Sequence, residues 1–86
     1  MSCKSLGWKL IEKAHGLGFR YTRLIDQSNV QFIMIQDRAV ILANSNELAH
    51  ECARECPDAI IWALVGPGKG DDYTANLIFE RLTARE

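Results

Sequence analysis

Residues 59–82 hold an apolar run, a glycine-rich loop and an amphipathic segment in direct succession. They read Ala-Ile-Ile-Trp-Ala-Leu-Val (59–65), Gly-Pro-Gly-Lys-Gly-Asp-Asp (66–72) and Tyr-Thr-Ala-Asn-Leu-Ile-Phe-Glu-Arg-Leu (73–82). An apolar run that is rich in branched residues and closed by glycine and proline is typical of a strand. Because the run is apolar on both faces, we expect a central strand around which the others pack.

The segment after the glycine loop has the spacing of a helix with one buried face. Asp71 or Asp72 is expected to cap its start, since short polar side chains accept hydrogen bonds from the first free amides of a helix. The expected buried positions are Ala75, Ile78, Phe79 and Leu82. The C-terminal third is thus predicted to form a strand–loop–helix unit.

Upstream of this unit, the pattern predicts two more helices and three more strands. The expected ranges are a helix at 5–15 with Ser5 as its N-cap, strands at 19–25, 30–35 and 39–43, and a helix that starts within 44–47 and ends at Cys56. Short links favour an antiparallel meander, whereas the helix between the last two strands favours a parallel, right-handed crossover. We therefore predict one compact α+β domain over residues 1–86, in the order α-β-β-β-α-β-α. Its four-stranded sheet is expected to be mixed, mainly antiparallel, and packed by helices in a two-layer arrangement.

Three of the expected strands are apolar on both faces, and three short helices are few to cover two sides of a sheet. If all the helices lie on one side, the other side exposes an apolar patch of the kind that soluble monomers usually reserve for partners. The candidates for that patch are Phe32, Met34, Val40 and Trp62. If the helices divide between the faces, no patch remains, and the sequence leaves both arrangements open.

Composition indicates a small globular protein whose charge is divided along the chain. The 86 residues are 48% hydrophobic and carry a net charge of −1. Residues 1–43 hold six Lys and Arg against three Asp and Glu, and residues 44–86 hold four against eight. A net charge near zero argues against DNA mimicry and against nucleic-acid binding by the whole molecule. No run approaches the ~20 apolar residues of a membrane span and no secretory signal is recognised, so we expect a cytoplasmic protein with reduced thiols.

The glycine loop at 66–70 invites comparison with the phosphate sites found at helix N-termini. It departs from the P-loop pattern, because Gly70 and two aspartates follow Lys69 where Ser or Thr is required. The aspartates also add negative charge at the helix end that would have to attract a phosphate. An ordinary strand–helix connection is the preferred interpretation, and a nucleotide- or phosphate-binding module is the alternative.

Metal, redox and catalytic sites find little support in the sequence. Cys52 and Cys56 lie four residues apart on the apolar face of the expected helix, where cysteine packs as a small hydrophobe. No Cys-x-x-Cys pair accompanies them, and Cys3 stands alone, so neither zinc nor another cofactor is expected. His15 and His50 fall on different elements, and no nucleophile is placed beside either. We expect a protein without enzymatic activity.

Charged and aromatic side chains supply the candidates for partner binding. The set is Trp8, Arg20, Tyr21 and Arg23 from a basic stretch, Glu51 and Glu55 from a solvated helix face, and Lys69 from the glycine loop. Arg, Trp and Tyr dominate the binding energy of protein interfaces. The basic stretch also resembles a backbone contact for RNA or DNA, but its charge density is ordinary, so direct nucleic-acid binding is not expected.

These features lead to the hypothesis of a small, non-enzymatic module that binds a larger protein or protein complex. Small chains of this kind are frequent among phage and mobile-element proteins that antagonise host defence. On that base rate we expect an inhibitor or adaptor that docks on a host complex, such as one that handles nucleic acid. A homodimer formed through an uncovered sheet face or an edge strand is a third interpretation.

Overall fold

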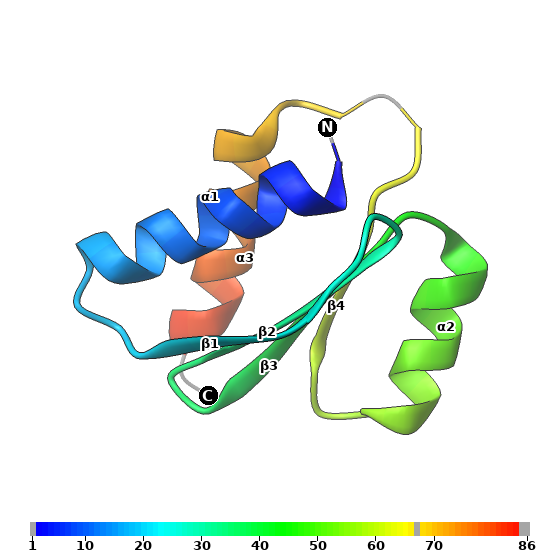
Figure 1. Ribbon diagram of the computed structural model, residues 1–86, viewed down its shortest axis with the longest axis horizontal. Helices are drawn as coiled ribbons and strands as arrows, with labels where there is room; N and C mark the ends of the chain where they lie inside the picture. Colours follow the sequence, from blue (N-terminus) through cyan, green and yellow to red (C-terminus); the bar gives the residue numbers. More distant parts are fainter. Residues whose placement is uncertain (1, 67, 85–86) are drawn as a thin grey trace.

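The computed structural model describes residues 2–66 and 68–84. The elements in these ranges are α1 (Cys3–Gly16), β1 (Tyr21–Asp26), β2 (Val30–Ile35), β3 (Arg38–Ala43), α2 (Asn46–Glu55), β4 (Ile60–Ala63) and α3 (Asp71–Thr83). The predicted order α-β-β-β-α-β-α and the α+β class with a mixed four-stranded sheet are confirmed. Figure 1 shows α1 and α3 on one side of this sheet and α2 on the other.

The strands are ordered β1-β2-β3-β4, with two antiparallel pairs followed by one parallel pair. The parallel β3–β4 pair and the α2 crossover agree with the prediction. The expectation that the apolar run at 59–65 forms the central strand is wrong, since β4 lies at the edge of the sheet and β2 and β3 are inner. Its apolar character has another cause, because α2 packs on one face of β4 and α3 packs on the other.

The helices divide two and one between the faces, so the sheet lies between two helix layers and the expected two-layer arrangement is wrong. The expectation that divided helices leave no patch is also wrong, because α2 covers only the β3–β4 half of its face. We call the face under α1 and α3 the covered face and the face that carries α2 the open face. On the covered face α1 packs against β2 and β1, and α3 packs against α1 and β4. On the open face α2 packs against β3 and β4.

The main core lies between the sheet and the α1–α3 layer. Its fully or almost fully buried members are Cys3, Leu6, Leu10 and Ala14 of α1, Ile33 and Ile35 of β2, Val40 and Leu42 of β3, Ile60 of β4, and Ala75, Ile78 and Phe79 of α3. Val40 is completely buried in this core and Trp62 packs against it. The expectation that either residue belongs to an exposed patch is therefore wrong, because both point to the covered face.

Two of the predicted helix starts are also wrong. The N-cap of α1 is Ser2, whose side chain accepts a hydrogen bond from the Ser5 amide while Ser5 Oγ accepts one from the Ser2 amide. Ser5 thus completes a capping box and does not start the helix. The N-cap of α3 is Gly70, which has no side chain to bond the first amides, so neither Asp71 nor Asp72 acts as a cap.

The last turn of α3 is held from the sheet. Arg38, the first residue of β3, donates from Nη1 to the carbonyl oxygens of Arg81 and Leu82 at 3.1 and 3.3 Å. These carbonyls have no partner within the helix and lie at its negative end, where a guanidinium is favourable. The predicted start of α2 within 44–47 is confirmed, and its N-cap is Ser45, whose Oγ accepts a hydrogen bond from the Leu48 amide.

Candidate functional site

The β1–β2 part of the open face is the candidate site, and we call it the open half. Its apolar side chains are Ile25 of β1 and Val30, Phe32 and Met34 of β2. The three β2 residues share a face because alternate residues of a strand point to the same side, and Ile25 stands directly opposite Phe32 in the β1–β2 pairing. Ile25 is 37% exposed, and the three β2 residues are partly exposed.

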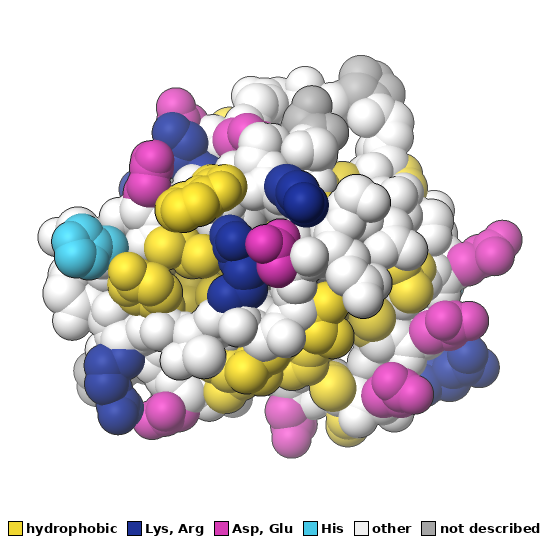
Figure 2. All heavy atoms as spheres, viewed as in Figure 1, with side chains coloured by type: hydrophobic (Ala, Val, Ile, Leu, Met, Phe, Trp, Pro, Cys, Tyr) yellow, Lys and Arg dark blue, Asp and Glu magenta, His cyan; other side chains and the backbone are white. Residues whose placement is uncertain are grey.

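The open half is uncovered because the helices of the chain are short and few. On the same face, Ile41 and Ala43 of β3 are fully buried beneath α2. That helix has only ten residues and lies over β3 and β4. Three of the four half-faces of the sheet thus carry a helix, and within residues 2–66 and 68–84 the fourth carries none. Figure 2 shows the result as a band of apolar side chains below the strands.

A row of glutamates on α2 borders the open half. Leu48 and Cys52 are half-buried toward the sheet, which fixes the rotation of the helix. In a right-handed β3–α2–β4 crossover, the side of the helix occupied by Glu51 and Glu55 then faces β2, and the side occupied by Ala53 faces the β4 edge. Glu47, one turn earlier, lies with His50 and Arg54 on the side of α2 that points away from the sheet. Figure 2 shows acidic side chains over α2 at the end of the apolar band.

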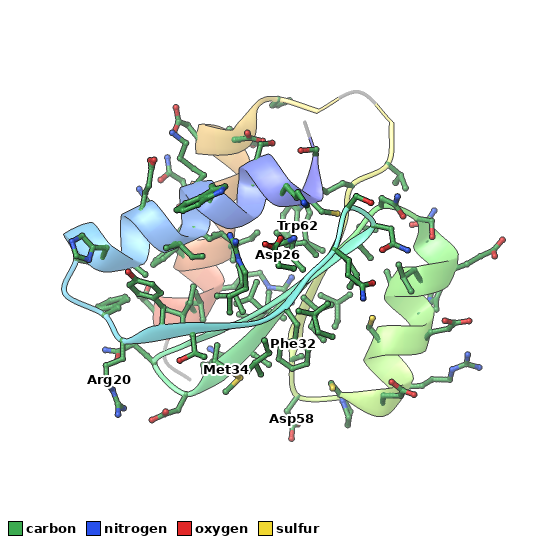
Figure 3. The ribbon with its side chains drawn as sticks, in the orientation of Figure 1. Arg20, Asp26, Phe32, Met34, Asp58 and Trp62 are labelled. Carbon is green, nitrogen blue, oxygen red and sulfur yellow. The ribbon has the colours of Figure 1, made fainter. Side chains whose placement is uncertain are left out.

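A hollow of about 320 Å³ lies where the end of α2 meets the open half. Its lining includes Met34 and Ala39 from the sheet and Cys56, Pro57 and Asp58 from the turn after α2. Figure 3 shows Phe32, Met34 and Asp58 on the same side of the sheet. Residues 46–58 hold four carboxylates against one arginine, so the wall of the open half formed by α2 and this turn is acidic.

Trp8 and Arg23 form a second exposed feature, on the covered side of β1. Trp8 of α1 is 60% exposed, and the guanidinium carbon of Arg23 lies 5.2 Å from its ring centroid. Arg23 Nη1 also donates to Asp26 Oδ2 at 3.1 Å. Only 20% of the Arg23 side chain is exposed, and its Nε and Nη2 are buried without a hydrogen-bond partner among the described residues. Arg23 is therefore a stacked and neutralised cation.

Gln31 lies beneath this pair and is completely buried. Its Nε2 donates to Asp26 Oδ1 at 2.6 Å and to the Gln27 carbonyl at 3.0 Å. Its Oε1 presses against α1 at Gly7, where a Cβ atom would lie only 2.8 Å from that oxygen. Glycine at this position is what allows α1 to approach β2 so closely.

The pKa of Asp26 is lowered by these contacts. The hydrogen bond from Gln31 is the largest cause, and the positive charges of Arg23 and Lys4 act in the same direction, whereas partial burial opposes them. The carboxylate is therefore the form that the covered side of the hairpin stabilises.

The structure brings only some of the predicted partner-binding residues together. Trp8 and Arg23 are in contact, and Tyr21 packs edge-on against His15, with ring centroids 6.3 Å apart, also on the covered side. Arg20 forms an exposed ion pair with Asp37, at 2.8 Å, beside the turn between β2 and β3. Figure 3 places Arg20 at the end of β1, on the side of Met34.

The remaining predicted residues lie elsewhere. Glu51 and Glu55 are exposed on α2 beside the open half. Lys69 lies over the Tyr73 ring, 5.5 Å from its centroid, in the loop before α3. Lys69 therefore does not join the other candidates.

Sequence reasoning missed Ile25 as a member of the open half and Gln31 as a buried polar residue. The register between β1 and β2 shifts between Arg23 and Ile25, which leaves Leu24 as an extra, bulged residue. A bulge changes which side chains share a face, and it leaves no signal in the alternation of one sequence. Gln31 did have a signal, because a lone polar residue within an apolar strand needs buried hydrogen-bond partners.

The thiols and carboxylates do not assemble a metal site. Within the described residues, no group of three metal-binding side chains is found. Burial raises the pKa of Cys3, and burial together with Glu55, Cys56 and Glu51 raises the pKa of Cys52. The apolar face of α2, predicted to include Cys52 and Cys56, is only half-buried, since none of the residues of α2 is fully buried.

The glycine loop ends in carboxylates whose surroundings differ. Residue 67 lies outside the described residues. Asp72 lies 3.2 Å from Lys9 of α1, whereas one oxygen of Asp71 is buried without a hydrogen-bond partner among the described residues. The first amides of α3 have no side-chain cap, which is the one feature of this loop that would suit an anion.

Comparisons with known proteins add no functional assignment. The chain matches no protein-family model, and searches of curated proteins and of solved structures gave no match. Among the residues that the structure describes, none of the helices has both the length and the apolar character that crossing a membrane requires.

Proposed function

We propose that this chain is a small, non-enzymatic protein-binding module and that the open half is its docking surface. The observation that carries the proposal is that, among the described residues, no helix covers the apolar side chains of the open half. Contiguous exposed apolar surface on a small protein is a common mark of a partner interface. Among the described residues, Ile25 of the open half is one of the exposed large apolar side chains, whereas Trp8 and Tyr21 are exposed on the covered side.

The state of the sheet edges favours docking on the face over pairing with an edge strand. The bulge at Leu24 interrupts the outer edge of β1, and bulges are a common device that prevents strand addition. The opposite edge, β4, offers only four residues and is flanked by helices on both faces. An occupant therefore gains more by covering side chains than by extending the sheet.

Affinity capture with a matched pair of variants tests this proposal. The double variant Phe32→Thr/Met34→Thr removes apolar surface from the open half and keeps residues that strands tolerate. The control Val65→Thr/Tyr73→Thr removes exposed apolar side chains near the glycine loop, at 49% and 47% exposure. We expect a protein that co-elutes with the wild type and with the control and is lost with the open-half variant.

Two outcomes contradict the proposal. One is capture that survives the Phe32→Thr/Met34→Thr change while that variant melts as one cooperative unit. The other is elution of the wild type alone from the cells that naturally express it. The role of an inhibitor or adaptor on a larger host complex stays a prediction from the sequence, and the identity of the co-eluting protein tests it.

The alternative, nucleotide or phosphate binding by the glycine loop, has one favourable observation, the uncapped start of α3. A thermal-shift panel separates it from the proposal. A ligand present at 100 times its Kd should stabilise the fold by about 2.7 kcal/mol. The absence of a shift with any nucleotide, with or without Mg²⁺, removes the alternative.

A further inference from the structure

We infer that the occupant of the open half is an amphipathic α-helix of a partner protein, with Lys or Arg along the edge that lies next to α2. This inference rests on the proposed function, and it adds the shape and the charge of the partner. Both follow from the open half and from the helix that borders it.

The shape of the open half suits a helix. Its floor is formed by β1 and β2, of six residues each, or about 20 Å of strand. A helix of about 13 residues has the same length. One wall is already present, since α2 stands on the same face over β3 and β4. A helix laid beside α2 would place apolar residues at spacings of three and four on Ile25, Phe32 and Met34.

The charge of the wall selects a basic helix. The rotation of α2 in a right-handed crossover turns Glu51 and Glu55 toward the open half. Asp58 lines the hollow at its end. Arg54 of α2 lies on the outward side of that helix with Glu47 and His50, and Arg20 is already paired with Asp37 at 2.8 Å. An acidic flank on the occupant would place like charges side by side, whereas Lys or Arg would form pairs with the row on α2.

A second copy of this chain fits the open half poorly. The helix that a second copy could offer on its own open face is α2, and the side of α2 away from its sheet carries Glu47, His50 and Arg54. Inserting that side against Phe32 and Met34 would remove charged groups from water without partners. The acidic wall would also repel the phosphates of a nucleic acid.

Selection from a display library tests the inference directly. The probe is a library of helical peptides of about 15 residues with a fixed apolar stripe and randomised flanks. It is selected on the wild-type protein and counter-selected on Phe32→Thr/Met34→Thr. We expect the enriched peptides to carry a net positive flank. Their affinity should fall about tenfold on Glu51→Lys/Glu55→Lys and change less than twofold on the matched reversal Glu12→Lys/Glu80→Lys, whose side chains lie on α1 and α3.

The possible results separate the two proposals. Peptides that need Phe32 and Met34 but bind equally well after charge reversal on α2, or that carry acidic flanks, overturn the basic partner and leave the docking surface standing. A selection that yields no peptide sensitive to Phe32→Thr/Met34→Thr overturns the helix-docking site. A wild-type chain that runs at twice the mass of one chain, and as one chain in the Phe32→Thr/Met34→Thr variant, overturns the inference in favour of a second copy.

Discussion

The two faces of the β1–β2 hairpin are formed by alternate residues of the same strands and lie in opposite environments. On the covered face Ile33 and Ile35 are completely buried beneath α1, and on the open face their neighbours Phe32 and Met34 stay partly exposed. The strand sequence is apolar in both directions. The difference therefore comes from the number of helices available to the sheet, which is a property of the whole chain.

The placement of polar and apolar side chains on the hairpin is in part the reverse of the usual one, with polar residues on the packed face and apolar residues on the exposed face. The tightly packed face contains Gln31, Asp26 and Arg23 in a connected network. The open face carries Ile25, Phe32 and Met34, with Thr22 of β1 opposite Met34. A polar network can become part of a core when its members are hydrogen-bonded to one another.

Truncation of adjacent residues in β2 should show the largest difference. Ile33→Ala removes a side chain with no exposed surface and should lower the free energy of unfolding by about 2–5 kcal/mol. Met34→Ala, one residue further along β2 and on the open face, should lower the free energy of unfolding by only about 1 kcal/mol. Met34 is partly exposed, so folding removes less of its apolar surface from water. Urea denaturation of both variants measures the difference. Equal losses would show that the open half is packed as tightly as the covered half.

Alanine substitution at two glycines of α1 should act in opposite directions. Gly7→Ala places a Cβ 2.8 Å from the buried Gln31 oxygen and should lower the stability by about 1–3 kcal/mol. Gly16→Ala meets no atom within 4 Å and should be neutral or stabilising by up to about 1 kcal/mol, since alanine is the better helix former. Thermal denaturation of the pair tests this. A stabilising Gly7→Ala would mean that α1 does not lie against Gln31.

Acid titration should reveal the network on the covered face. The folded state holds the pKa of Asp26 below its ordinary value near 3.8, so its stabilising effect is present above about pH 4 and is lost as the pH falls through the folded-state pKa. Wild type should therefore exceed Asp26→Asn in stability at pH 7, and the gap should narrow as the pH falls below 3.8 and through the folded-state pKa. Denaturation of both proteins across this range measures it, with Asp58→Asn as the control on the open side. A gap that does not change with pH would remove the proposed role of the charge.

Thiol labelling should give the smallest but most local contrast. Cys3 is buried in the covered core with a raised pKa, and its alkylation should follow the opening of the fold. Cys52 and Cys56 on the open face are half-exposed and should react in the native state, with Cys52 slowed because its pKa is raised by burial and by Glu55. Mass spectrometry after timed iodoacetamide pulses, with and without mild urea, measures the three rates. Native-state labelling of Cys3 at the rate of the others would contradict the packing of α1.

Local signals explain which parts of the fold were predictable. Periodicity, the Ser45 cap and the proline after Cys56 are short-range features, so the element order and the parallel crossover could be derived from the sequence. The position of β4 could not, because a strand covered by α2 and α3 at the sheet edge has the same apolar pattern as a central one. Ser2 and Ser5 are equally good cap residues, and only the geometry shows that they bond each other.

The candidate site was predictable in part. Phe32 and Met34 were expected in an exposed patch and lie in the open half, whereas Val40 and Trp62 point to the covered face. Assigning faces requires the register of neighbouring strands, and the bulge at Leu24 alters that register without a sequence signal. Trp8 and Arg23 were both predicted to be exposed candidates for partner binding. Trp8 is exposed, whereas Arg23 is largely buried and paired with Asp26.

The unequal anchoring of α3 gives the molecule a direction of opening. Arg38 holds the last turn of the helix to β3, while the first turn has no side-chain cap, and Asp72 in that turn pairs with Lys9 at the exposed surface. Thermal fluctuations should therefore unwind α3 from Gly70 toward its C-terminal end. The amide protons of its first turn should exchange with solvent well before those near Phe79, and a protease should first reach the chain at the glycine loop.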